Sequence, residues 1–194
     1  MLDMVELVLF HHAQGLTAGC RAFAAGLSAA GHTVHVPDLY EGATFDTLAA
    51  GIAHSERLGF DTVIERGRRA AAVLPPGIVY AGLSLGVMPA QLLAQTRPGA
   101  RGAVLLHAAV PPAEFGGPWP PGVPLQIQTM DADPLGDADV ARRLAATVEG
   151  AELFLYPGAR HLFSDEGLPD YDGPAAALLK QRVLAFLARI DAPA

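Results

Sequence analysis

Short runs of apolar residues alternate along the chain with longer stretches in which apolar residues recur every three or four positions. Short apolar runs bounded by Gly, Pro or Asp are typical of buried strands, and the longer stretches are typical of helices packed on one side. The pattern predicts strands at residues 5–10, 33–36, 77–81, 102–107, 124–129 and 151–156. It predicts helices at 17–30, 85–95, 137–148 and 174–190, and two more within 44–74, where Gly51 and Gly59 break the pattern. In the last helix the expected core positions are Leu178, Val183, Phe186 and Leu187.

Strands that alternate with helices over the whole length indicate an α/β fold, with three layers and a mostly parallel sheet of about six strands. A length of 194 residues suits one domain, so we expect residues 1–194 to form a single unit. In such a sheet, functional groups gather in the loops at the carboxyl ends of the strands. Ser84 and the loops at 11–15, 131–133 and 158–161 all follow predicted strands, so we expect them at one edge.

The composition favours a globular protein without a membrane or nucleic-acid partner. The chain is 51% hydrophobic, yet no run of about 18 apolar residues is free of charge, Pro or Gly. A net charge of −7 argues against binding a phosphate backbone. The single cysteine, Cys20, excludes an internal disulfide and leaves no cysteine cluster for zinc. The first six residues carry acids and no basic region typical of a signal peptide, so we expect a cytoplasmic location.

The pentapeptide Gly82-Leu83-Ser84-Leu85-Gly86 lies between a predicted strand and a predicted helix. This is the setting of a nucleophile elbow, in which a sharp turn presents a strained serine and the glycines remove side chains that would clash. The context makes the motif much more specific than the pentapeptide alone. Ser84 is therefore the expected nucleophile.

A serine nucleophile needs a base, and in the hydrolase order of Ser, acid and His that base follows Ser84 in the sequence. His107 and His161 are the histidines after Ser84. His107 ends a predicted strand, where a packed structural histidine is the favoured interpretation. His161 follows the last predicted strand in a turn suited to presenting an imidazole, so we expect it to be the base, with a structural turn histidine as the alternative.

The acid of such a triad is expected in the loop after the fifth strand. Asp133 is the favoured candidate there, and Asp131 remains the alternative. A helix cap or a solvated turn residue is the competing interpretation, and it applies to Asp131 and Asp137 more than to Asp133. The oxyanion of the reaction would be bound by the backbone N–H of Leu85 and by one from the loop at 11–14, where Ala13 is favoured.

Together these segments resemble the dienelactone hydrolase family of α/β hydrolases over nearly the whole chain. The resemblance rests on the Gly15 loop, Gly31-His32, Val36-Pro37-Asp38-Leu39-Tyr40, the elbow at Ser84, Asp133, and Tyr156-Pro157-Gly158-Ala159-Arg160-His161-Leu162-Phe163. It implies a minimal α/β-hydrolase fold without an inserted lid domain, a triad of Ser84, Asp133 and His161, and oxyanion donors at Ala13 and Leu85. It implies no cofactor and no metal.

The chain departs from that family at three positions that matter for the substrate. The namesake enzymes have a cysteine nucleophile where this chain has Ser84. A glutamate before the oxyanion residue is His12 here, and an arginine that binds the substrate carboxylate is Asp165 here. An acid at this position would repel an anionic lactone, so a neutral small-molecule ester, lactone or thioester is expected. The expected substrate-contacting residues are His12, Phe115, Trp119 and Leu162, although the last three could instead form a subunit contact in a homodimer.

The sequence thus favours a serine hydrolase acting on small carboxylic esters or lactones. A catalytically inactive hydrolase fold that binds a small molecule or a partner is the alternative, because fold does not fix function. A metal-dependent hydrolase using His11 and His12 is less favoured, since adjacent side chains on an extended segment point to opposite sides.

Overall fold

The computed structural model describes residues 4–191, and its centre is one parallel sheet. Every strand pairing in this part of the chain is parallel, in the order β2-β1-β3-β4-β5-β6. The strands are β1 (Glu6–Phe10), β2 (Thr33–His35), β3 (Val79–Leu83), β4 (Gly102–Leu106), β5 (Leu125–Met130) and β6 (Glu152–Tyr156). The predicted α/β fold and its sheet are confirmed.

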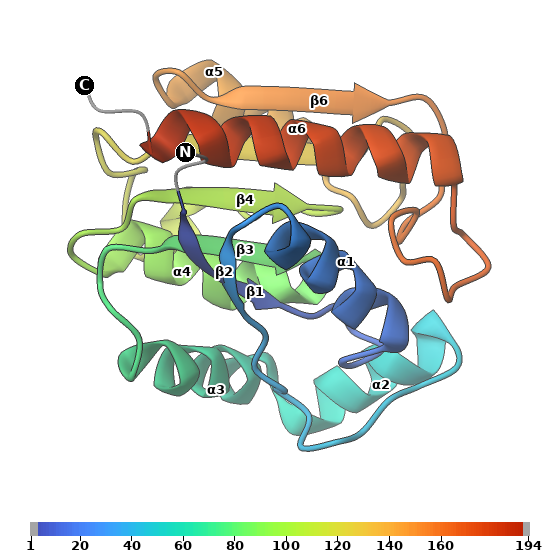
Figure 1. The fold of residues 1–194 in the computed structure, drawn as a ribbon. Helices are drawn as coiled ribbons and strands as arrows, with labels where there is room; N and C mark the ends of the chain where they lie inside the picture. Colours follow the sequence, from blue (N-terminus) through green and yellow to red (C-terminus); the bar gives the residue numbers. More distant parts are fainter. Residues whose placement is uncertain (1–3, 192–194) are drawn as a thin grey trace.

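Helices cover both faces of the sheet, which gives the expected three layers (Figure 1). The helices are α1 (Ala18–Ala29), α2 (Leu48–Leu58), α3 (Phe60–Ala72), α4 (Val87–Thr96), α5 (Ala138–Thr147) and α6 (Gly173–Asp191), with short 3-10 helices at Ser84–Gly86 and Pro112–Phe115. Leu7 and Leu9 of β1 pack on the side of α1 and α6, whereas Val8 and Phe10 pack on the side of α3, α4 and α5. This alternation follows from the two-residue period of a strand.

Two predictions about helices need correction. Gly51 does not break a helix, because it lies inside α2, which begins after Thr47, whose hydroxyl accepts a hydrogen bond from the Ala50 N–H at 3.2 Å. A Cβ at Gly51 would lie only 2.7 Å from the Ala13 carbonyl carbon, so the glycine permits close packing of a loop on the helix. Gly59, with φ of +87°, does separate α2 from α3.

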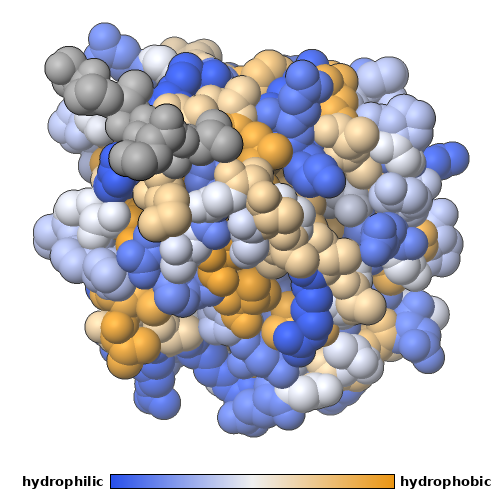
Figure 2. Space-filling view, in the orientation of Figure 1, coloured by the Kyte–Doolittle hydropathy of each residue, from blue (hydrophilic) through white to orange (hydrophobic). Residues whose placement is uncertain are grey.

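The second correction concerns which side of α6 faces the core. Leu178 is 39% exposed, whereas Leu179 is fully buried. Leu179, Val183, Phe186 and Leu187 share one face because they are spaced by three or four residues, as a packed helix requires. None of the helices in the described part of the chain combines the length and apolar character needed to cross a membrane. On the face shown in Figure 2, apolar residues lie in small areas separated by hydrophilic ones.

Candidate active site

Ser84 lies at the turn between β3 and α4, in a backbone conformation that is unfavourable for a serine. Its φ of +50° falls in the left-handed region, where a non-glycine residue typically costs about 1–3 kcal/mol. A Cβ on Gly82 would lie 2.5 Å from the Val87 nitrogen, and one on Gly86 would lie 2.7 Å from the His11 carbonyl oxygen. Glycine at both positions therefore lets the chain turn tightly against β1 while presenting the Ser84 side chain.

The side chains of Ser84, His161 and Asp133 form a continuous line of hydrogen bonds. The Ser84 Oγ lies 2.7 Å from His161 Nε2, and His161 Nδ1 lies 2.7 Å from Asp133 Oδ2. Because Nδ1 faces a carboxylate, it carries the ring proton, and Nε2 is left to accept the serine hydroxyl. The loops after β3, β5 and β6 bring these three residues together from distant parts of the sequence.

Asp133 is held in place by its surroundings. It is 6% exposed, His161 is 4% exposed, and the Leu135 N–H donates to Asp133 Oδ1 at 2.9 Å. The alternative acid, Asp131, is exposed and accepts a hydrogen bond from the Gly158 N–H at 3.1 Å. The geometry therefore places Asp133, and not Asp131, beside the imidazole.

Asp137 immediately precedes α5, but its side chain makes no capping hydrogen bond. Of the two interpretations for Asp137, a helix cap and a solvated turn residue, its exposure fits the second. Burial raises the pKa of Asp137, and the nearby Asp133 carboxylate raises it further. Asp137 instead lines the cavity in front of Ser84.

His107 is fully buried behind His161, as expected of a structural histidine. Its Nε2 lies 2.6 Å from the Ser164 hydroxyl, and its ring meets Phe163 edge-on at a centroid separation of 4.7 Å. Its Nδ1 has no hydrogen-bond partner within the described chain. Burial lowers the pKa of His107 well below the usual value, with the nearby His161 as a further cause, so the ring is neutral.

Ala13 and Leu85 line the same cavity as Ser84 and His161. Leu85 follows the serine in the 3-10 helix, and Ala13 lies in the loop between β1 and α1. The Ala13 N–H donates no hydrogen bond to another residue of the described range 4–191. The close packing of this loop on Gly51 holds it against α2. Both residues therefore border the cavity into which Ser84 opens.

The cavity in front of Ser84 has a volume of about 260 Å³ and mostly apolar walls. None of the described residues that line it is a lysine or an arginine. They are Ala13, Leu48, Ile52, Ser55, Phe60, Ser84, Leu85, Met88, Ala108, Val110, Leu135, Asp137 and His161.

The sequence matches the profile of the Dienelactone hydrolase family over residues 4–191. The chain belongs to this family. A comparison with curated protein sequences gives no match.

Several solved structures share the fold of this dienelactone hydrolase family member. A Klebsiella pneumoniae protein assigned as a dienelactone hydrolase is 18% identical with a TM-score of 0.73, over 96% of this chain and 88% of the other. The dienelactone hydrolase of Anabaena variabilis is 19% identical with a TM-score of 0.67, over 96% and 87%. A dienelactone hydrolase-like promiscuous phosphotriesterase from metagenomic libraries is 19% identical with a TM-score of 0.69, over 99% and 89%. At these identities the likeness concerns the fold.

The structure does not bring the four expected substrate-contacting residues to the Ser84 cavity. Trp119 packs against the core beside α4 and α5, and its indole N–H donates to the Val123 carbonyl at 2.8 Å. Phe115 is partly buried in the same proline-rich segment and does not line the cavity. Leu162 is 2% exposed and lines a neighbouring cavity of about 190 Å³. His12 is 1% exposed, and its ring contacts Asp165 and does not line the cavity.

The cavity walls come instead from residues that the sequence did not single out. Leu48 and Ile52 belong to α2, Phe60 begins α3, and Met88 lies in α4. Phe60 and Leu135 are each 43% exposed, which is unusual for large apolar side chains and is accounted for by their place at the cavity. Their position depends on how α2 and α3 pack, which periodicity alone does not give.

Asp165 does not face an incoming substrate, which the sequence had led us to expect. It is 4% exposed, and its Oδ2 accepts hydrogen bonds from His12 Nε2 at 2.8 Å and from the Thr17 hydroxyl at 2.6 Å. Asp165 therefore does not line the Ser84 cavity and cannot repel a substrate by direct contact there.

Two neighbouring histidines face different partners. His11 Nε2 accepts the Leu39 N–H at 3.0 Å, and its Nδ1 donates to the His12 carbonyl at 2.8 Å. Burial lowers the pKa of His11 to about 4, so this ring is neutral. Because the His12 ring turns to Asp165, the two imidazoles do not converge on one ligand position.

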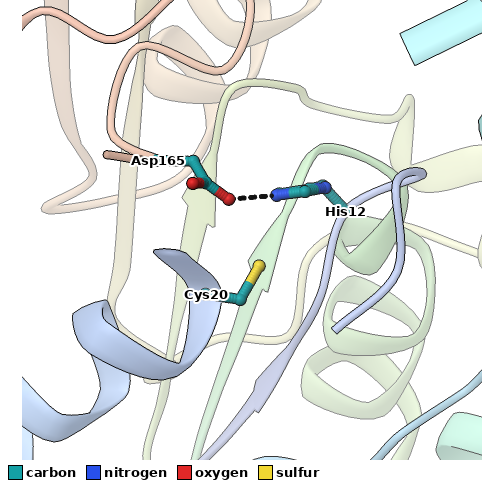
Figure 3. A group of neighbouring side chains, drawn as sticks. All are labelled: His12, Cys20 and Asp165. Atoms are coloured by element: carbon teal, nitrogen blue, oxygen red, sulfur yellow. Dashed lines mark hydrogen bonds and ion pairs between the residues drawn. The ribbon is translucent and has the colours of Figure 1, made fainter. Parts of the chain in front are cut away.

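A different group of potential metal ligands is formed by His12, Cys20 and Asp165, whose ligand atoms lie within 4.8 Å of one another (Figure 3). In this group, however, the Asp165 Oδ2 already accepts two hydrogen bonds, and its Oδ1 accepts the Gly167 N–H at 2.9 Å. The carboxylate is satisfied without an ion. The chemistry of this group is that of a hydrogen-bond network.

Proposed function

We propose that this protein is a serine hydrolase that cleaves a small carboxylic ester, lactone or thioester through an acyl-enzyme. The observation that carries the proposal is the line of hydrogen bonds from Ser84 through His161 to Asp133, with 2.7 Å at each step. A catalytically inactive member of the family would be favoured by a separation of more than about 5 Å between Ser84 and His161. The observed contact supports the enzyme over that alternative.

In the first half of the reaction, His161 Nε2 takes the proton of Ser84 while Oγ forms a bond to the substrate carbonyl carbon. The carbonyl oxygen becomes an oxyanion, which accepts hydrogen bonds from the N–H groups of Ala13 and Leu85. When the tetrahedral intermediate collapses, the bond to the leaving group breaks and His161 returns the proton to it. Asp133 holds the imidazole in the required orientation and stabilises its positive charge.

In the second half, His161 takes a proton from water, and the hydroxide oxygen attacks the acyl carbon. Collapse releases the carboxylic acid and gives the proton back to Ser84 Oγ. No cofactor enters this sequence of steps. Serine has no thiolate-like form near neutral pH, so turnover depends strongly on His161 as the base.

The cavity supports a neutral substrate with a small apolar acyl group. A volume of about 260 Å³ with leucine, isoleucine, phenylalanine and methionine walls suits a short hydrocarbon chain. Asp137 is the carboxylate that lines this cavity beside the triad histidine, and among the described lining residues there is no lysine or arginine to bind an anion. An anionic acyl group would therefore be disfavoured on both counts.

Labelling with a fluorophosphonate probe tests the proposal, because the probe reacts with an activated serine. We expect the wild-type protein to be labelled and to hydrolyse short p-nitrophenyl esters, and Ser84→Ala to lose both properties while remaining folded. If the wild type is neither labelled nor active on esters, lactones and thioesters, the proposal is wrong.

A further inference from the structure

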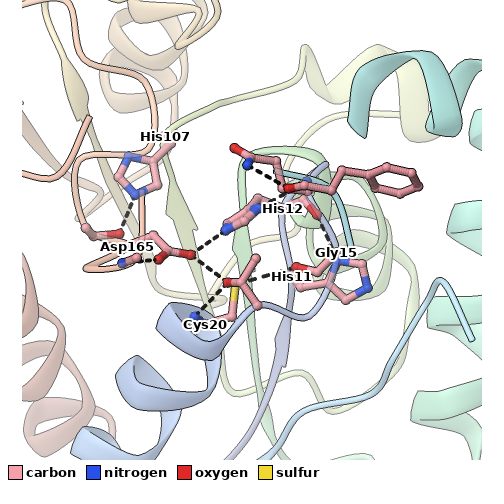
Figure 4. Close-up of polar contacts among 11 residues, drawn as sticks. His11, His12, Gly15, Cys20, His107 and Asp165 are labelled. Carbon is pink, nitrogen blue, oxygen red and sulfur yellow. Dashed lines mark hydrogen bonds and ion pairs between the residues drawn. The ribbon is translucent and has the colours of Figure 1, made fainter. Parts of the chain in front are cut away.

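A buried histidine–carboxylate pair joins His12, the residue before Ala13, to Asp165 in the segment between β6 and α6 (Figure 4). Both residues are almost fully buried, at 1% and 4% exposed, and the ring and carboxylate are 2.8 Å apart. A buried pair of this kind costs desolvation, so it is weak evidence for a stabilising role. Neither residue contacts Ser84 or lines its cavity.

Asp165 connects parts of the chain that are far apart in sequence. It lies four positions after His161, in the segment between β6 and α6, and its Oδ1 accepts the Gly167 N–H of the same segment at 2.9 Å. Its Oδ2 accepts the Thr17 hydroxyl at 2.6 Å, and Thr17 caps the start of α1. A Cβ at Gly19 would lie 2.8 Å from Asp165 Oδ2, so α1 approaches the carboxylate closely because that position is glycine.

His12 holds the loop on either side of Ala13. The Gln14 N–H donates to His12 Nδ1 at 3.2 Å, and the Gly15 N–H donates to the His12 carbonyl oxygen at 3.0 Å. With Nδ1 accepting, Nε2 carries the proton and donates it to Asp165. The conformation of residues 12–15 is therefore tied to the orientation of one imidazole ring, which Asp165 sets.

The protonation of the pair agrees with this arrangement. Burial acts to raise the pKa of Asp165, but hydrogen bonds from His12, Thr17 and the Gly167 N–H outweigh it and lower that pKa. Burial acts to lower the pKa of His12 and the hydrogen bond to Asp165 acts to raise it, but Nδ1 accepts the Gln14 N–H, which only a neutral ring can do. Asp165 is thus a carboxylate, and the proton shared along this contact belongs to His12.

We propose that His12 and Asp165 are positioning residues for the hydrolase reaction. They hold the Ala13 N–H at a fixed position relative to the loop that carries His161. This inference rests on the proposed function. The pair links the segment carrying one oxyanion donor to the segment carrying the base, so a change in either residue would shift the two relative to each other. The substrate and the reacting atoms are not contacted by the pair.

The test compares Asp165→Asn and His12→Gln with His35→Gln. His35 forms a similar pair with Glu6 at 2.7 Å, but both are about one-third exposed and lie outside the Ser84 cavity, so this variant is a matched control. On a p-nitrophenyl ester we expect kcat to fall about 10- to 100-fold for the first two variants, less than the hundred- to thousand-fold typical of removing an oxyanion donor. KM should change less than about threefold, and His35→Gln should match the wild type.

Inhibition by a boronic acid separates positioning from a merely structural role. The boronate forms a tetrahedral adduct with serine whose oxygen occupies the oxyanion position, and its Ki does not depend on the fraction of protein that is folded. We expect Ki to rise by the same factor by which kcat falls. The double variant should be no more than about threefold worse than either single variant, because the pair acts as a unit.

The outcomes distinguish this inference from the proposed function. A wild type that is inert to fluorophosphonate and to esters would remove the proposed function, and the positioning role with it. A wild type that is active, with Asp165→Asn and His12→Gln unchanged in kcat and boronate Ki, would overturn the positioning role alone. Should Asp165→Asn fail to fold, Thr17→Val removes one hydrogen bond to the same carboxylate and is expected to raise the boronate Ki about threefold or more; an unchanged Ki would overturn the role.

Discussion

Replacing Gly51 by alanine is expected to damage the reaction without touching any group that takes part in it. Gly51 lies inside α2, and the loop that carries the Ala13 N–H packs directly on it. A Cβ at this position would lie 2.7 Å from the Ala13 carbonyl carbon and 3.0 Å from the Gln14 Cα. Both neighbours are backbone atoms, so rotating a side chain cannot relieve the overlap.

The size of the effect follows from these distances. The Ala13 carbonyl oxygen lies closer still, so to reach the shortest ordinary contact of 3.4 Å the Ala13 backbone must move by roughly 1 Å. A misplacement of about 1 Å at a catalytic group can cost a hundred-fold in rate. We therefore expect kcat/KM to fall about 10- to 100-fold on p-nitrophenyl esters, mainly through kcat because the oxyanion contact is made in the transition state.

Gly26→Ala is the matched control, since it is also a glycine-to-alanine change within a helix. Its new Cβ would meet the flexible Lys180 side chain at 3.3 Å, which can move aside. It should keep wild-type activity and gain up to about 1 kcal/mol of stability from helix propensity. Initial rates would be normalised to the folded fraction from thermal unfolding. If Gly51→Ala keeps kcat/KM within twofold of Gly26→Ala, Ala13 does not supply the oxyanion donor.

Three further predictions concern the cavity walls and the buried histidine. Met88→Ala enlarges the apolar cavity, so the preferred p-nitrophenyl ester should lengthen by about two carbons, measured as kcat/KM against acyl length; no shift would mean that Met88 does not limit the acyl group. Asp137→Asn removes a negative charge beside Ser84. At pH 8 it should raise kcat/KM for an ester with an anionic acyl group, relative to kcat/KM for a neutral ester, about 3- to 10-fold. An unchanged ratio would rule out a part for Asp137 in selecting substrates by charge. Burial lowers the pKa of His11 from 6.5 to about 4, so the unfolded chain binds more protons in that range and stability is lost as the pH falls through it. Urea unfolding should show His11→Gln losing about 3 kcal/mol less than the wild type between pH 7 and pH 4, and equal losses would contradict a neutral buried ring.

The fold and the meeting of Ser84, Asp133 and His161 could be predicted from the sequence because they depend on order along the chain. Each residue follows a strand, and parallel strands end at the same edge of a sheet. The sequence predicts the strand before Ser84 two residues too early, since Gly77 and Ile78 extend the apolar run while strand pairing begins at Val79. The error changes no conclusion about the site.

Side-chain direction could not be predicted in the same way. Asp165 follows the base by four residues and was expected to face the substrate, but His12 and Thr17 draw its carboxylate into the interior. The cavity walls come largely from α2, α3 and α4, and the packing of α2 on α3 and of α3 on α4 decides which residues reach the cavity. In α6, by contrast, Leu178 and Leu179 are equally apolar, but Leu179 lies four residues before Val183, so the helical period itself favours Leu179 as the buried residue.

The contact between Ser84 and His161 joins positions 77 residues apart, from a strand near the middle of the sheet to a loop after its last strand. During synthesis, Ser84, the proposed nucleophile, therefore leaves the ribosome long before His161, the proposed base, and a chain that ends before β6 lacks that base. Reactivity toward a fluorophosphonate should consequently return late in refolding, after β5 and β6 have joined the sheet. Labelling of Ser84 by the probe would therefore measure the fraction of molecules in which the sheet is complete.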